Sequence, residues 1–213
     1  TVKQEAKNFK LEFNIRNRLE SWNNKDFDSS TDDAYALIRQ RYSMFATYNA
    51  GEVPFFSEIR FVRTELDPFT SLELQQLYMD VGKDLRMRLG RQMMHFGDRR
   101  VISMHPWGDT GIVFDGVRLT AKEKNFTADI LAMNRFLYHK PGQGQERLYG
   151  IYAGWKKDTT EIDGYFLTKE KDQGAYDDGL RQIRTAGLRF RQENGNWTYG
   201  LEGMRQFGCE GDK

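Results

Sequence analysis

Apolar and polar residues alternate with a period of two along most of the chain. In the segment 9–16, every second residue from Phe9 to Ile15 is large and apolar, and the residues between them are charged or amides. Successive side chains of a β-strand point to opposite faces, so this pattern predicts a strand with one apolar and one polar face. Residues 32–40 are the best helical candidate, but their continuation to residue 48 fits a strand better. Cutting the chain at turn signals predicts eleven strands: 9–23, 33–48, 53–65, 72–81, 85–93, 114–121, 126–137, 147–155, 161–169, 181–191 and 197–207.

The connections between these predicted strands are alternately long and short. The longest are 94–113 and 170–180, whereas 82–84 and 192–196 are short, and the second contains the hairpin signal Asn194-Gly195. In an up-and-down antiparallel sheet, every second connection lies at the same end, and transmembrane barrels keep short periplasmic turns and long external loops. The sequence therefore predicts an all-β, antiparallel, up-and-down transmembrane β-barrel. A soluble carbohydrate-binding β-barrel with longer loops at one open end is the alternative.

Composition changes this picture in two respects. The 213 residues include 32 Lys plus Arg and 31 Asp plus Glu, a net charge of +1 that argues against a nucleic-acid partner. Hydrophobic residues make up 38%, which is low for a soluble core, but a wall with one face toward lipid and one toward water averages to a hydrophilic sequence. The single cysteine, Cys209, excludes an internal disulfide and a cysteine-cluster metal site, and its role is left open.

The segment 85–119 carries an ordered set of motifs. They are Arg88-Leu89-Gly90-Arg91-Gln92, Phe96-Gly97-Asp98 with Arg100, Trp107, and Phe114-Asp115 followed by Arg118-Leu119. This combination resembles the alginate-export family of bacterial outer-membrane β-barrel channels. The resemblance implies a porin-like channel in the bacterial outer membrane for passive passage of anionic or carbohydrate solutes, with membrane lipid as its surroundings. The family is named for a member that exports alginate, but the motifs do not imply that alginate is the substrate of this chain.

The strand number departs from the family. The resemblance implies a barrel of eighteen strands, an even number as in bacterial single-chain barrels, whereas the sequence predicts about eleven. An open sheet would leave unpaired strand edges in lipid, where they are not tolerated. We therefore expect residues 1–213 to form a single β-barrel domain that is incomplete at its C-terminal end, or one that other polypeptides complete.

Placing the apolar residues outward turns many arginines toward the lumen. The candidate pore-lining residues are Arg39, Arg41, Arg60, Arg86, Arg88, Arg91, Arg118, Arg189 and Arg191, and Arg16 and Arg18 share that face. Rings of basic side chains select anions, and the guanidinium fork binds carboxylates in bidentate fashion. Acidic residues on the same strands offer salt-bridge partners, so we expect most arginines to stabilise the wall and a few to set selectivity. Strict alternation would leave Arg91 on the lipid side, where its side chain would snorkel toward the strand end. We favour the alternative, a bulge at Gly90 that turns Arg91 inward.

The long loop 94–113 is predicted to fold inward and narrow the pore. Its candidate constriction residues are Asp98, Arg100, Trp107 and Asp115. His95 and His105 are ten residues apart, which is too weak a signal for a metal site. The sequence contains no Gly-rich phosphate loop and no nucleophile elbow, so we expect neither an enzyme nor a cofactor.

A second hypothesis within the outer membrane is a structural barrel that acts as a scaffold or sleeve for partner subunits. It predicts an occluded lumen, whereas the channel predicts a conducting one. The sequence leaves open the solute, the direction of transport and whether the pore is open.

Overall fold

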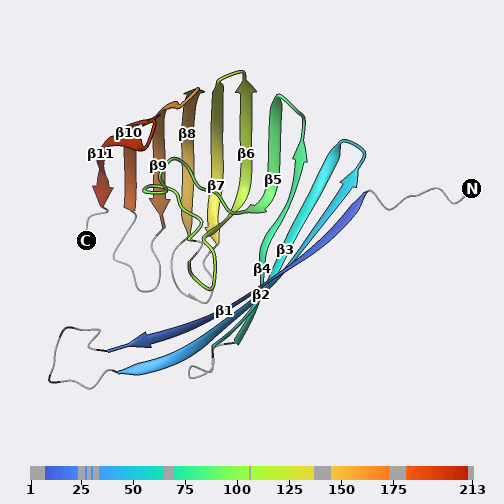
Figure 1. The fold of residues 1–213 in the computed structure, drawn as a ribbon. Helices are drawn as coiled ribbons and strands as arrows, with labels where there is room; N and C mark the ends of the chain where they lie inside the picture. Colours follow the sequence, from blue (N-terminus) through green and yellow to red (C-terminus); the bar gives the residue numbers. More distant parts are fainter. Residues whose placement is uncertain are drawn as a thin grey trace, which may run out of the picture.

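The computed structural model describes residues 8–23, 27, 30, 34–64, 70–105, 107–136, 145–172 and 181–210. These residues form one antiparallel sheet in which each strand pairs with its neighbours along the chain (Figure 1). The strands are β1 (Phe9–Trp22), β2 (Tyr35–Ala50), β3 (Val53–Thr64), β4 (Thr70–Val81), β5 (Leu85–Gln92), β6 (Val113–Glu123), β7 (Phe126–Phe136), β8 (Glu146–Lys157), β9 (Thr160–Lys171), β10 (Arg181–Asn194) and β11 (Trp197–Glu210). This confirms the predicted all-β, up-and-down architecture, and the strand ends differ from the predicted ones by at most three residues. The predicted ends at 33, 65 and 137 lie outside the described residues. No helix in the described segments is long and apolar enough to cross a membrane.

Hairpin chemistry accounts for the short connections. Four of them are two residues long, and their first residues, Gly51, Lys124, Asp158 and Gly195, have φ angles of 63°, 45°, 53° and 58°. Positive φ at this place matches the primed turns whose twist suits a two-stranded hairpin. The long connections join the opposite ends of the strands, as the antiparallel order of the sheet requires. The predicted alternation of long and short connections is therefore confirmed.

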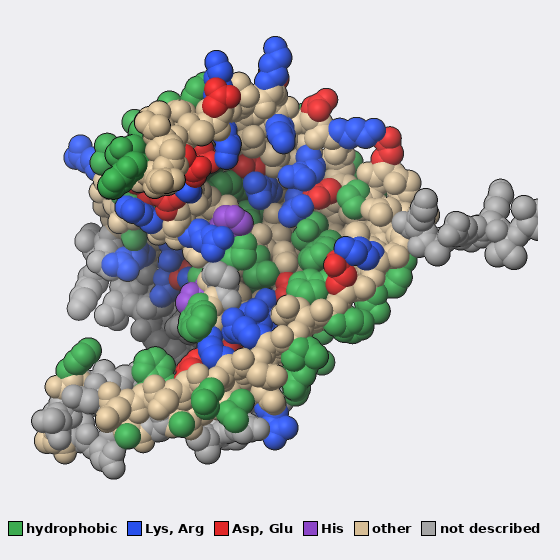
Figure 2. Space-filling model, viewed as in Figure 1, with side chains coloured by type: hydrophobic (Ala, Val, Ile, Leu, Met, Phe, Trp, Pro, Cys, Tyr) green, Lys and Arg blue, Asp and Glu red, His purple; other side chains and the backbone are tan. Residues whose placement is uncertain are grey.

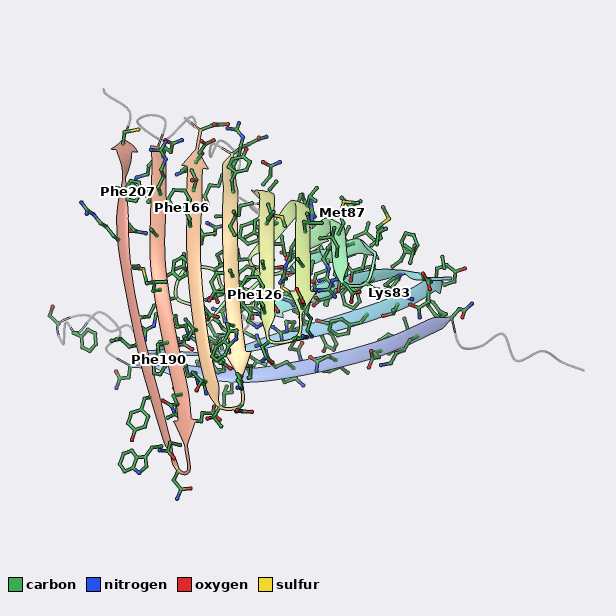
Figure 3. The ribbon with its side chains drawn as sticks, turned by 90° about the horizontal axis from the view of Figure 1, so that it is seen from above. Lys83, Met87, Phe126, Phe166, Phe190 and Phe207 are labelled. Carbon is green, nitrogen blue, oxygen red and sulfur yellow. The ribbon has the colours of Figure 1, made fainter. Side chains whose placement is uncertain are left out.

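The sheet curves around a hollow. Strands β5–β11 stand side by side, and β1–β4 swing away from them (Figure 1). Seen from above, β1 runs across the direction of β8–β11; Phe126, Phe166 and Phe207 mark β7, β9 and β11 (Figure 3). The sheet thus has a concave and a convex face, and the two faces carry different side chains.

The convex face is apolar and exposed, whereas the concave face carries buried charged and polar side chains together with a buried apolar cluster on β6–β9. Leu19, Leu72, Leu188 and Leu201 on the convex face are 70–75% exposed. On the concave face, buried charged and polar residues include Glu58, Arg60, Glu73, Asp80, Asp129 and Arg189, all less than 9% exposed. A soluble protein has the reverse distribution, because charged residues are almost never fully buried unless they are paired. Lys, Arg, Asp and Glu side chains gather in the hollow in Figure 2.

The sheet is open among the described residues. Pairing runs without a break from β1 with β2 to β10 with β11, and β1 and β11 form the two edges. Each edge strand therefore has one ladder of backbone hydrogen bonds on its inner side, and its other side is available for a further strand.

One sequence-based detail of the wall is wrong. The predicted bulge at Gly90 does not occur, because the register runs unbroken through Tyr78–Gly90 and Gly90–Gly116. The glycine is required for another reason: its φ is +119°, and a Cβ there would lie 2.3 Å from a backbone oxygen of β4. The bulge is in the neighbouring pair instead, at Glu58/Ile59 of β3, where Gln75 of β4 is the extra residue. The alternation of β5 therefore continues, and Arg91 stays on the convex face.

Candidate functional site: the concave face and its inward loop

The connection between β5 and β6, residues 93–112, lies in the hollow in front of β7–β9 (Figure 1); we call it the inward loop. Three of its apolar side chains, Met94, Phe96 and Ile102, are buried in a cluster with inward-facing residues of β6–β9. The ring of Phe96 stacks on Tyr152 with 4.5 Å between centroids. The buried apolar cluster of this sheet therefore lies between the loop and the wall, and it fixes the loop inside the hollow.

Arg189 of β10 anchors one end of the loop. Its side chain is 4% exposed, and it donates hydrogen bonds to Asp98 of the loop at 2.8 Å and to Asp163 of β9 at 2.7 Å. A third carboxylate, Glu161, accepts at 3.2 Å. The hydrogen bond from Arg189 lowers the pKa of Asp98 below its ordinary value. Nearby, Arg100 Nε lies 3.4 Å from a carboxylate oxygen of Glu202 on β11.

Five guanidinium groups from β1–β3 surround the other end of the loop. This arginine cluster consists of Arg16, Arg18, Arg39, Arg41 and Arg60. All of them except Arg39 donate to three successive backbone oxygens of the loop, those of Trp107, Gly108 and Asp109, at distances of 2.7–3.3 Å. A backbone carbonyl oxygen accepts a hydrogen bond but carries no net charge. The loop backbone therefore binds the arginines without neutralising them.

Three carboxylates balance part of that charge. Asp109 pairs with Arg39 and lies 3.5 Å from Arg16 and 3.6 Å from Arg18. Glu20 pairs with Arg18 and Arg39, and Glu58 with Arg60 at 2.7 Å. Glu73, buried opposite Arg60 in the register, is a fourth carboxylate beside the cluster, so the five cations exceed these anions by one.

Trp107 lies beside the cluster with its ring largely uncovered. The side chain is 68% exposed, and the guanidinium carbons of Arg18 and Arg16 lie 4.8 and 6.0 Å from the centre of its ring. The contact between a cation and an aromatic face is attractive. The ring therefore contacts the arginines and presents much of its surface to the hollow.

The other inward arginines of the sheet form ion pairs along the wall. Arg88 binds both oxygens of Asp80 at 2.7 Å, and Arg118 binds both oxygens of Asp129 at 2.7 and 3.0 Å. Arg86 is 4.0 Å from Asp80, with a side chain 41% exposed, and an exposed ion pair of this kind contributes little. Arg191 pairs with Glu193 at 2.9 Å. These pairs support the expectation that most arginines stabilise the wall.

Two of the predicted site residues do not lie where the sequence placed them. Arg91 faces the convex side and binds both oxygens of Asp115 at 2.7 and 2.8 Å. Asp115 belongs to β6 rather than to the loop, opposite Arg91 in the register. Because the alternation of β5 continues through Gly90, Arg91 and its partner Asp115 both face the convex side. Neither residue therefore belongs to the constriction.

The structure brings the remaining predicted residues to the concave face. Asp98, Arg100 and Trp107 are in the inward loop, and Arg39, Arg41, Arg60, Arg86, Arg88, Arg118, Arg189 and Arg191 are on the concave side of the strands. The residue that the sequence did not single out is Asp109. Its partners are 70 to 93 residues away, and no local pattern indicates them. In the part of the chain that the structure describes, no group of three His, Cys, Asp or Glu residues could hold a metal ion.

Comparison with known proteins identifies the family. The model of the alginate-export family matches residues 7–213, nearly the whole chain. No curated protein matches the sequence. The open eleven-stranded sheet, with its polar concave face and inward loop, thus belongs to a protein of the alginate-export family.

Proposed function

We propose that the protein is a channel of the bacterial outer membrane through which anionic or carbohydrate solutes pass passively along the concave face. The observation that carries this proposal is the reversed distribution of side chains, with exposed leucines outside and buried ion pairs inside. Lipid stabilises exposed apolar side chains, and water in a lumen solvates charged ones. The same observation disfavours a soluble carbohydrate-binding barrel, whose outer face would be polar.

The open edges lead to a requirement for further strands. Each backbone N–H or C=O group that lacks a hydrogen bond in hydrocarbon costs on the order of several kcal/mol. Strands beside β1 and β11, from the same polypeptide or from another one, would complete the wall. The partners of this surface are therefore membrane lipid and the polypeptide that closes the barrel.

The arginine cluster and the inward loop form the proposed constriction. The excess positive charge of the cluster lies next to the exposed ring of Trp107, so an anionic sugar unit would find both a cation and an apolar ring face there. The other inward arginines contribute to the stability of the wall through their carboxylates. This assigns selectivity to β1–β3 and to residues 107–109.

Block of the ionic current by an oligosaccharide tests this assignment. An oligo-uronate should block current through the protein in a planar bilayer at lower concentration than a neutral dextran of the same length. Arg41→Gln should weaken block by the oligo-uronate by about tenfold, as expected for the loss of one hydrogen bond between charged groups. Arg63→Gln, the same change at an exposed residue of the convex face, is the matched control and should have no effect.

The scaffold or sleeve is the second candidate function. The specific observation in its favour is that the inward loop occupies the hollow and is bound at both ends. A protein that reaches the bilayer, as shown by heat-modifiable mobility, and yet carries no current would favour the sleeve. Equal block by the oligo-uronate and the dextran would contradict the assignment of the arginine cluster.

A further inference from the structure

A cavity of about 340 Å³ lies between the inward loop and the concave face of β6–β11. Its lining includes Arg135 and Glu146, at the ends of β7 and β8 that carry the long connections. Pockets for small ligands span about 300–1,000 Å³, so this volume suits one small molecule. No member of the arginine cluster lines the cavity. It is therefore a separate place from the proposed constriction.

The floor and walls of this cavity are apolar. Two isoleucines come from the loop and the rest from the strands: Ile102, Ile112, Leu148, Leu167, Ile183 and Met204. A sugar would have to place hydroxyl groups against these side chains, where they would lose hydrogen bonds to water without a replacement. The walls therefore suit an apolar body and not the polysaccharide of the proposed function.

The charged part of the lining is mainly cationic, and Ser103, Thr185 and Gln206 add neutral polar groups. Arg100, Arg135, Arg147 and Lys169 line the cavity together with a single carboxylate, that of Glu146. Arg135 and Lys169 share one oxygen of that carboxylate, at 2.8 and 3.2 Å. One negative charge thus serves two cations, and the Lys169 ammonium has three N–H donors.

Two of these cations are accessible from the hollow. The side chain of Lys169 is 48% exposed and that of Arg100 is 60% exposed. Arg147 binds Asp172 at 2.6 Å, whereas the contacts of Arg100 with Glu202 and of Lys169 with Glu146 are longer, at 3.4 and 3.2 Å. An anion at the mouth of the cavity would meet Lys169 and Arg100 while its apolar body contacts the walls.

We propose that this cavity binds an amphipathic monoanion, in which a compact apolar body fills the space between Ile102 and Ile183 and a carboxylate, sulfonate or phosphate contacts Lys169 and Arg100. The site does not depend on the proposed conduction of polysaccharide. Binding can be measured without any current, so the two proposals can fail separately.

Isothermal titration calorimetry tests the site directly. The protein is placed in lipid nanodiscs, because a detergent is itself an amphiphile and would compete. Three probes are compared: naphthalene-1-sulfonate, inorganic sulfate and 1-naphthalenemethanol. The sulfonate should bind at least tenfold more tightly than either of the others, since it alone combines the charge with the apolar body.

Two variants and one matched control locate the binding. Lys169→Gln should weaken binding of naphthalene-1-sulfonate by about tenfold, while Glu146 keeps its bond to Arg135. Ile183→Trp should abolish binding by filling the cavity. Lys83→Gln, at a turn lysine whose side chain is 77% exposed, should leave binding unchanged.

Three results would overturn the proposal. Sulfate binding as tightly as the sulfonate would mean that charge alone is recognised, and equal binding of the naphthalenemethanol would mean that only apolar contact matters. An equal effect of Lys169→Gln and Lys83→Gln would place any binding outside this cavity.

Discussion

Replacing Arg189 with methionine removes the buried cation that holds the inward loop to β9 and β10. Methionine keeps much of the side-chain volume and loses the charge, so the change tests the ion pairs rather than the packing. Arg189 is 4% exposed, and its guanidinium contacts the carboxylates of Asp98, Glu161 and Asp163. The variant therefore leaves three carboxylates with fewer partners.

The size of the effect follows from what each carboxylate retains. Removing one partner of a buried ion pair destabilises a protein by about 3–5 kcal/mol. Glu161 keeps a hydrogen bond from Lys156 at 2.7 Å, and Asp163 keeps one from the hydroxyl of Tyr152 at 2.9 Å. These bonds favour the lower end of the range, so we expect a loss of about 3 kcal/mol in the free energy of unfolding.

Urea unfolding in liposomes, followed by tryptophan fluorescence, measures this loss. Arg191→Met is the matched control, since Arg191 lies two residues along the same strand face and pairs with Glu193 in an exposed position, where an ion pair contributes about 0–1 kcal/mol. Asp98→Asn should cost about 1 kcal/mol, because the side chain of Asp98 is 35% exposed and screening by solvent reduces the effect.

The double variant shows whether the two residues act on each other. If Arg189 binds Asp98 as described, Asp98→Asn should have a smaller effect in the Arg189→Met background than in the wild type. Equal losses for Arg189→Met and Arg191→Met would refute the reasoning. So would full additivity of the Asp98 and Arg189 substitutions.

Three further predictions follow from single contacts. The pKa of Asp98 is lowered on folding, so its ion pair should contribute stability at neutral pH and lose it as the pH falls below the ordinary value of 3.8; unfolding midpoints of wild type and Asp98→Asn should therefore converge in acid, and a constant difference would contradict this. Gly90→Ala should cost about 1–3 kcal/mol in unfolding experiments, since it adds a Cβ 2.3 Å from a backbone oxygen at positive φ, whereas Gly200→Ala, with open space around it, should cost almost nothing. Replacing both Arg91 and Asp115 with leucine should leave stability in liposomes unchanged or raise it, because a charge on the lipid face costs about 2–4 kcal/mol at mid-membrane; a clear loss would place that face in water.

The strands and their faces were predictable from the sequence because they depend on local alternation. Segment 9–16 shows one apolar and one polar face, and the structure puts Phe13 and Ile15 on the exposed convex side. Turn chemistry is equally local, as Gly195 with its positive φ shows. The concave position of Arg39 and Arg189 follows from the same period.

The contacts of the inward loop were beyond such reasoning. Asp98 meets Arg189 across 91 residues, and Asp109 meets Arg18 across a similar separation. Met94 and Phe96 anchor the loop, but two apolar residues in a loop do not indicate which strands they will meet. These contacts depend on the curvature of the whole sheet, which no segment encodes alone.

The bulge was misplaced for a comparable reason. Glycine within a strand is typical of a bulge, yet the strand pairing at Gly90 is regular. The glycine is needed there because a side chain would collide with a backbone oxygen of β4. The actual bulge at Gln75 has no glycine beside it, and its neighbours Leu74 and Gln76 give no turn signal. The glycine thus indicated an unusual backbone position, but it did not distinguish a bulge from a close approach of two strands.

The reversal potential of the current under a salt gradient tests most directly whether a cationic constriction selects anions. With potassium chloride at tenfold different concentrations on the two sides of a planar bilayer, we expect a reversal potential whose sign shows a preference for chloride over potassium. Asp109→Asn should strengthen that preference, because it removes the negative charge of a carboxylate that pairs with the arginine cluster. A preference for potassium in the wild type, or an unchanged reversal potential in Asp109→Asn, would contradict selection of anions by the arginine cluster.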